Sequence, residues 1–204
     1  MITLLIFLFG TMLAGFHPGT NYTITSGKYD ELKIAYNPEN KLVTGYYFNG
    51  TGDDRHGHSQ FTCIFYLEGK LAGNKAKLVT YYPSDKKEIE VGTLTVTGDN
   101  EFTIKLAKDH GGCWNVQPFE KEPVDFQLDQ KEKWLEAKYV ITPRAYFYND
   151  KNDATKRKAY MVKGDVIYID KIENGWLHCT YYNESDKSTT GWIKSGVINI
   201  DPDN

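Results

Sequence analysis

Positive charge is not in excess in this sequence. Lys and Arg together number 24, against 27 Asp and Glu, and the formal net charge is -3 at pH 7. Nucleic acids and anionic membrane surfaces attract proteins through basic patches, which this balance does not provide. The sequence also lacks a Gly-x-Gly-x-x-Gly motif and a Walker-type Gly-Lys-Ser/Thr, the patterns that cradle phosphates. We therefore expect no nucleic-acid partner and no cofactor.

Long apolar runs are scarce, and the longest spans Ile2 to Leu13. At about a dozen residues it is too short to cross a bilayer comfortably, and the small residues that follow it are typical of a secretory signal peptide. We expect a signal peptide at 1–16 and a periplasmic or secreted protein. No Lys or Arg precedes the run, which is atypical of a signal peptide, and a retained short anchor is the alternative for an apolar run of this length. Phe16 stands where a lipoprotein cleavage box needs Cys, so no lipid anchor and no stable membrane insertion after processing are expected.

Cysteine is rare, with three residues in the chain. Cys63 and Cys113 both fall in the front part, and an oxidising compartment would let them pair. We therefore expect a disulfide between them, on the argument of compartment alone. Cys179 alternates with Leu177 and Tyr181 along an expected strand, which indicates a small apolar core residue.

Aromatic residues, in contrast, are abundant, with 15 Tyr, and Gly occurs 18 times. A Tyr-rich chain without a long helical pattern favours β structure. We expect strands at 32–36, 42–47, 61–67, 77–82, 90–97, 101–107 and 124–128. The front domain, 17–134, is therefore expected to be an antiparallel β-barrel or sandwich. Residues 131–137 have helical composition and lie where a linker to a second domain at 138–200 would be.

Two hairpins are predicted in detail. Residues 37–40, Asn-Pro-Glu-Asn, are those that turns prefer, so the strands at 32–36 and 42–47 should pair. In the second hairpin, period-two alternation places five apolar side chains on one face. These are Leu94, Val96, Phe102, Ile104 and Leu106.

Residues 50–58, Gly-Thr-Gly-Asp-Asp-Arg-His-Gly-His, form a polar loop with two carboxylates and two imidazoles. Such groups could ligate zinc or another transition metal. The spacing matches no recognised metal motif of the His-Glu-x-x-His kind, and a solvated loop rich in turn formers accounts for the same residues. We favour the solvated loop and expect no metal site.

The stretch 109–115, Asp-His-Gly-Gly-Cys-Trp-Asn, is a second candidate for chemistry. A Cys near a His can form a thiol nucleophile, and paired glycines could expose backbone amides to an oxyanion. A nucleophile must be a free thiolate, however, whereas an exported Cys with a second Cys in its domain more often forms a disulfide. We therefore assign no catalytic residue. An exported hydrolase centred on Cys113 or on His56 and His58 stays the alternative.

The last third of the chain carries four short motifs in a fixed order. They are Ala145-Tyr146-Phe147-Tyr148, Lys163-Gly164-Asp165 before the apolar strand at 166–169, Asn174-Gly175-Trp176, and Gly191-Trp192-Ile193. This order resembles the bacterial SH3-like (SH3b-type) family. The resemblance implies a small SH3-like antiparallel barrel at 138–200, which would make the whole chain all-β. It implies a binding module and no activity.

In that family such modules are associated with binding cell-wall peptides or docking onto a partner domain. Carried over to the matching positions, the resemblance implies four aromatic binding residues: Tyr146, Tyr148, Trp176 and Trp192. Rings at the rim of a barrel give broad, stiff contact area for an extended peptide or a sugar, although core packing accounts for any one ring equally well. Two polar insertions, 149–158 and 183–190, depart from the family pattern and would alter the shape of a groove.

The sequence thus predicts an exported, non-enzymatic binding protein, and the resemblance to the SH3-like family implies a bacterial one. It would recognise a cell-envelope component, such as a cell-wall peptide, or another exported protein, as an inhibitor or immunity factor does. The alternative is an exported hydrolase that acts on envelope material. The lack of a complete catalytic set in the sequence favours binding.

Overall fold

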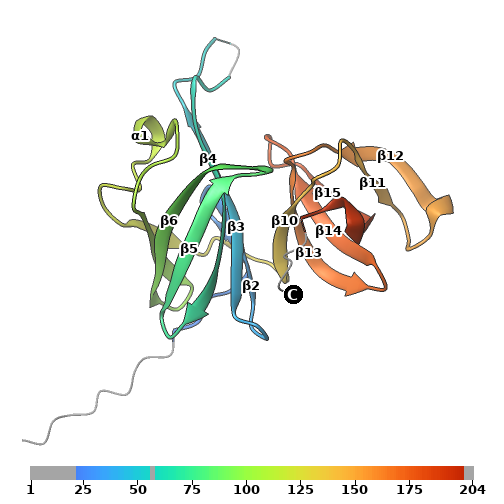
Figure 1. Cartoon of the computed structure of the whole chain (residues 1–204), viewed down its shortest axis with the longest axis horizontal. Helices are drawn as coiled ribbons and strands as arrows, with labels where there is room; N and C mark the ends of the chain where they lie inside the picture. Colours follow the sequence, from blue (N-terminus) through green and yellow to red (C-terminus); the bar gives the residue numbers. More distant parts are fainter. Residues whose placement is uncertain (1–21, 56–57, 200–204) are drawn as a thin grey trace, which may run out of the picture.

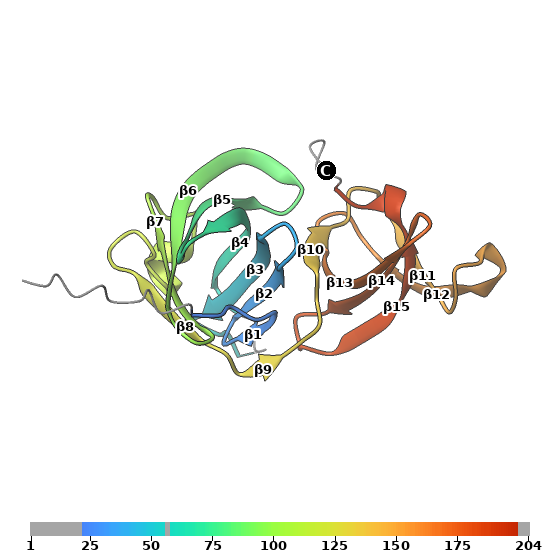
Figure 2. The ribbon, with the colours of Figure 1, turned by 90° about the horizontal axis from the view of Figure 1, so that it is seen from below.

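The computed structural model describes residues 22–55 and 58–199. Most of this part is β structure, arranged as two antiparallel sheets of nine and six strands (Figure 1). The larger sheet curls into a half-barrel, and the smaller sheet lies beside it (Figure 2). The predicted all-β class is therefore confirmed.

In the larger sheet the strands follow the order β8-β7-β6-β5-β4-β3-β2-β1-β9. The turn at 37–40 joins β2 to β3, and β6 pairs with β7, so both predicted hairpins are present. The bounds are β1 (Gly27–Tyr29), β2 (Leu32–Asn37), β3 (Leu42–Thr51), β4 (Phe61–Ala72), β5 (Lys75–Tyr82), β6 (Asp85–Gly98), β7 (Glu101–Leu106), β8 (Val124–Gln127) and β9 (Gln130–Lys131).

The concave interior of the larger sheet holds its hydrophobic core. Aromatic rings pack closely there: Tyr47 stacks on Phe65 with centroids 5.2 Å apart, and Phe119 meets Tyr47 edge-on at 5.0 Å. Such offset and edge contacts stabilise a core beyond the area that they bury. The five side chains that the alternation predicts on one face are all buried in this core, namely Leu94, Val96, Phe102, Ile104 and Leu106.

A disulfide fastens the short helix α1 (Cys113–Val116) to β4. Cys63 and Cys113 are bonded, with their Cα atoms 4.3 Å apart, so the predicted pairing is confirmed. Gly112, which precedes the helix, has φ of +88°, and a Cβ there would lie 2.1 Å from the carbonyl oxygen of Thr62. Only glycine allows the chain to approach β4 this closely in that conformation.

The smaller sheet has the order β10-β13-β14-β15-β11-β12. Asn174 and Gly175 have φ of +48° and +80°, the left-handed pair that a two-residue hairpin turn between β13 and β14 requires. Cys179 is a free, buried thiol in the core of this sheet, as predicted. The bounds are β10 (Glu136–Tyr139), β11 (Ala145–Tyr148), β12 (Lys156–Met161), β13 (Val166–Glu173), β14 (Trp176–Tyr182) and β15 (Ser188–Lys194), with short 3-10 helices at Asp153–Thr155 and Ser195–Val197.

The two sheets meet at β10. The backbone N–H of Ala137 donates to Thr44 Oγ1 at 2.7 Å, and the hydroxyl of Tyr66 donates to the Ala137 carbonyl at 2.9 Å. The ring of Trp134 lies 4.3 Å from that of Tyr168. The helical composition of 131–137 was therefore misleading, because these residues end β9, cross between the sheets and begin β10. The division into domains stays a prediction, since both sheets contribute to one buried cluster here.

No helix in the described part of the chain is long and apolar enough to cross a membrane. The expected signal peptide at 1–16 lies outside the described residues, as does His56 of the polar loop. Export therefore stays a prediction.

The disulfide closes a loop of 50 residues, so we expect it to stabilise the larger sheet. Replacing both cysteines, C63S with C113S, should lower the free energy of unfolding by roughly 2 to 5 kcal/mol, because the unfolded chain regains the entropy of the open loop. Urea denaturation measures this. Adding a reductant should destabilise the native chain and leave the double variant unchanged. Equal stability of the native chain with and without reductant would contradict the structural role.

Candidate functional site

Three of the four rings that the sequence proposes for binding gather on one surface of the smaller sheet. Tyr148 pairs with Trp192 in register, and its ring meets that of Trp176 edge-on at 4.9 Å. The three residues come from β11, β14 and β15. We call Tyr148, Trp176 and Trp192 the aromatic face.

Strand alternation explains why these rings share a surface. On β14 the side chains of Leu177 and Cys179 are buried in the core, so Trp176 and His178 point to the opposite side. On β15 Gly191 precedes Trp192, and a Cβ at that glycine would lie 3.0 Å from the Tyr148 carbonyl oxygen. The glycine thus lets β11 approach β15 closely enough to bring the rings together.

Sequence reasoning overlooked His178. It stands opposite Trp192 in register, with ring centroids 5.2 Å apart, and its Nδ1 lies 2.7 Å from Asp170 Oδ1. Trp176 and His178 are two residues apart on an expected strand, and this spacing alone predicts that both side chains lie on one face. His178 extends the aromatic face by one ring.

Lysine side chains surround the aromatic face. The ammonium group of Lys151 lies 5.0 Å from the Trp192 ring centre, and that of Lys194 lies 5.6 Å from the Trp176 ring centre. Glu173 accepts hydrogen bonds from Lys151 and Lys171, which lower its pKa to about 2. The lysines are thus held near the rings by carboxylates and by cation–π attraction.

Tyr146 does not join the aromatic face. Its ring lies 5.5 Å from that of Tyr160 on β12, and the ammonium group of Lys156 lies 3.6 Å from its centre. A register shift falls between Tyr146 and Tyr148 on β11. Tyr146 therefore lies on the smaller sheet, but its ring packs with Tyr160 in a pair separate from the aromatic face.

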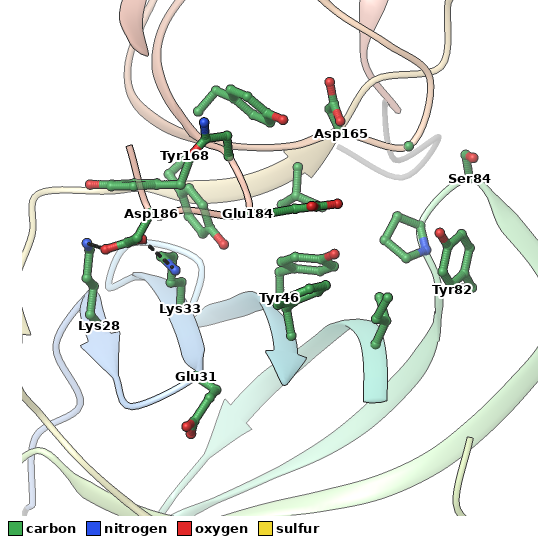
Figure 3. Close-up of a pocket in the computed structure, with 18 of the residues that line it drawn as sticks. Lys28, Glu31, Lys33, Tyr46, Tyr82, Ser84, Asp165, Tyr168, Glu184 and Asp186 are labelled. Carbon is green, nitrogen blue, oxygen red and sulfur yellow. Dashed lines mark hydrogen bonds and ion pairs between the residues drawn. The ribbon is translucent and has the colours of Figure 1, made fainter. Parts of the chain in front are cut away.

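A cleft of about 480 Å³ lies between the two sheets and contains none of the four predicted rings (Figure 3). Lys28 on β1 and Lys33 on β2 both pair with Asp186, at 2.5 Å and 3.1 Å, and this contact joins the larger sheet to the β14–β15 loop. Tyr182 lies beneath the same lysines. The inserted loop at 183–190 therefore forms part of a cleft wall. From the sequence, this loop was predicted only to depart from the SH3-like pattern.

The stretch around Cys113 lacks the groups of a thiol nucleophile. The sulfur of Cys113 is bonded to Cys63. His110 is buried, which lowers its pKa, and its Nε2 lies 2.7 Å from the hydroxyl of Thr80. The disulfide therefore removes the free thiolate on which a hydrolase centred on Cys113 depends.

The polar loop gives no sign of a metal site in the residues that the structure describes. His58 and Asp54 are linked, since the backbone N–H of His58 donates to Asp54 Oδ1 at 3.0 Å. Within 22–55 and 58–199, no group of three or more His, Cys, Asp and Glu residues could hold a metal ion.

Comparisons with protein-family models, with curated proteins and with solved structures gave no match to this chain.

Tyr148 is the most deeply buried ring of the aromatic face, with 9% of its surface exposed. We expect Tyr148→Ala to lower the free energy of unfolding by about 3 kcal/mol, because it leaves a cavity beside Trp176. The half-buried Tyr146 is the matched control, and Tyr146→Ala should cost only about 1 kcal/mol. Chemical denaturation of both variants compares the two. Equal losses would mean that Tyr148 is no more a packing residue than Tyr146.

Proposed function

We propose that this chain is an exported, non-enzymatic binding protein that recognises a cell-envelope component or another exported protein through its aromatic face. The observation that carries the proposal is the gathering of Tyr148, Trp176 and Trp192 from three strands onto one surface. A sheet holds such rings rigidly, so little conformational entropy is lost when a ligand covers them.

The residues in and around the aromatic face favour a sugar or an extended peptide as the ligand. The half-buried rings of Trp176 and Trp192 suit the flat, partly apolar faces of a sugar or an extended peptide. Lys171 and Lys194 stay about half exposed at the edge of the rings, with 58% and 47% of their side-chain surface accessible. Lys171 already pairs with Glu173 and Lys194 with Asp153, but each ammonium group has further N–H donors for the carboxylates that cell-wall peptides carry. The resemblance of the motifs at 145–148, 163–165, 174–176 and 191–193 to SH3-like modules supports the same ligand class.

Two further features support export. The apolar run that ends at Leu13 has the length of a signal-peptide core. Disulfides form and persist in oxidising compartments, and the Cys63–Cys113 bond is compatible with one.

Binding of the mature chain to purified cell-wall sacculi, and its capture of partners from envelope fractions, test the proposal. Trp192→Ala should weaken the binding that is found by roughly 1 to 4 kcal/mol, the range expected when an aromatic anchor is removed. Trp114→Ala is the matched control, because Trp114 is 67% exposed and lies in α1, on the larger sheet.

Melting curves of both variants separate binding from folding. If Trp192→Ala lowers stability and leaves affinity per folded molecule unchanged, the site is not the aromatic face. Equal losses of binding in the two tryptophan variants would also contradict the proposal, since the effect would then not be local.

A further inference from the structure

The inter-sheet cleft has the form of a second binding site, independent of the aromatic face. One wall comes from the larger sheet and includes Tyr46 of β3 and the turn at 82–84. The other comes from the smaller sheet, from the turn at 163–165 and the segment at 181–186. A volume of about 480 Å³ lies within the range of clefts that hold small ligands or single side chains.

The charges of this cleft are not balanced. Three lysines and five carboxylates line it, and two of the lysines already pair with Asp186. Asp165 and Glu184 form no ion pair with any residue of the part that the structure describes. The lining groups are Lys28, Lys33 and Lys163 on the positive side, and Asp30, Glu31, Asp165, Glu184 and Asp186 on the negative side.

Asp165 is the least hydrated of the unpaired carboxylates. It is half-buried, and burial raises its pKa even though its Oδ2 accepts the backbone N–H of Val162 at 2.7 Å and the carboxylate also accepts a hydrogen bond from the Tyr181 hydroxyl. Burial of an ionised carboxylate is unfavourable unless an opposite charge lies nearby. A cation in the cleft would supply that charge.

Tyr46 lies close to the same carboxylates. Burial, and after it the neighbouring Tyr82, Asp165, Tyr181 and Glu184, raise the pKa of the Tyr46 hydroxyl. Figure 3 shows Asp165, Glu184 and Tyr46 around one part of the cleft, with Tyr82 at its far side. Organic cations bind well where aromatic rings lie beside two carboxylates that have no other ion-pair partner.

A separate observation also indicates a ligand with a hydrogen-bond donor. Tyr168 lines the cleft and is only 2% exposed, yet its hydroxyl has no hydrogen-bond partner among the described residues. Tyr46, Tyr182 and Asp186 lie near this hydroxyl and line the cleft as well. Because a buried polar group without a partner is unfavourable, an N–H group that enters the cleft would satisfy it.

We propose that the inter-sheet cleft binds an organic ammonium group, such as a lysine side chain of an extended peptide or a small amine. Asp165 and Glu184 pair with the charge, and the ring of Tyr46 contacts the cation and its alkyl chain. The hydroxyl of Tyr168 accepts a hydrogen bond deeper in the cleft. An anion is disfavoured, because the lining holds more carboxylates than lysines, and Lys28 and Lys33 already pair with Asp186.

The test uses the mature chain and Nα-acetyl-lysine-N-methylamide as the probe, with binding followed by NMR chemical shifts. The probe should bind, and its Nε-acetylated form, which has lost the charge, should bind at least about tenfold more weakly. Asp165→Asn and Glu184→Gln should each weaken the lysine probe by about tenfold. Asp125→Asn removes an exposed carboxylate on β8, outside the cleft, and should leave binding unchanged.

Folding is controlled in two ways. Asn at position 165 can still accept the Val162 N–H, and Glu184 is exposed, so Glu184→Gln gives a second readout that does not depend on a buried group. Equal binding of the charged and acetylated probes would overturn the proposal, as would equal binding by the native chain and both cleft variants.

Two further experiments identify the source of the ammonium group and the site at which the probe binds. Cadaverine, a free diamine, is compared with a Lys-containing tripeptide: tighter binding of the tripeptide supports a peptide source, and tighter binding of cadaverine supports a small amine. Trp192→Ala should leave lysine-probe binding unchanged. If it abolishes that binding in a folded protein, the probe binds at the aromatic face and the cleft proposal is wrong.

Discussion

The arrangement of the whole molecule depends on how the backbone of Ala137 is hydrogen-bonded. Its N–H donates to Thr44 Oγ1 and its carbonyl accepts from the Tyr66 hydroxyl, and both partners belong to the larger sheet. Ala137 itself is part of β10, which pairs with β13 in the smaller sheet. Buried backbone groups without partners are strongly disfavoured, so β10 cannot leave either sheet without losing hydrogen bonds. The two sheets are therefore held in one relative position.

Other contacts strengthen this junction, and the inter-sheet cleft depends on it. Tyr139 meets Tyr66 edge-on at 5.4 Å, and Trp134 covers Tyr168 at 4.3 Å. Tyr168 thus belongs both to the buried cluster of the junction and to the wall of the cleft. The aromatic face, in contrast, is built within the smaller sheet by strand pairing alone. The two candidate sites therefore have different structural origins, and a loosened junction should affect the cleft first.

Local patterns in the sequence predicted the features that arise from strands close together in the chain. The alternation from Leu94 to Leu106 predicted a hairpin because its two strands are adjacent, and the same period brings Trp176 and Trp192 to one surface. The junction could not be predicted, because Thr44 and Ala137 lie far apart in sequence and their contact has no period. Tertiary hydrogen bonds also overrode the helical composition of 131–137. The cleft was missed for the same reason, since Tyr46 and Asp165 meet only after the sheets have docked.

Hydrogen exchange of the Ala137 amide tests this account most directly. If Thr44 holds that N–H in a buried junction, the amide should exchange as slowly as the amides of the interior strands β3 and β13, because both require global opening. Exchange at the rate of an exposed linker, while β3 and β13 stay protected, would show that the sheets are not fastened at β10 and would contradict the account.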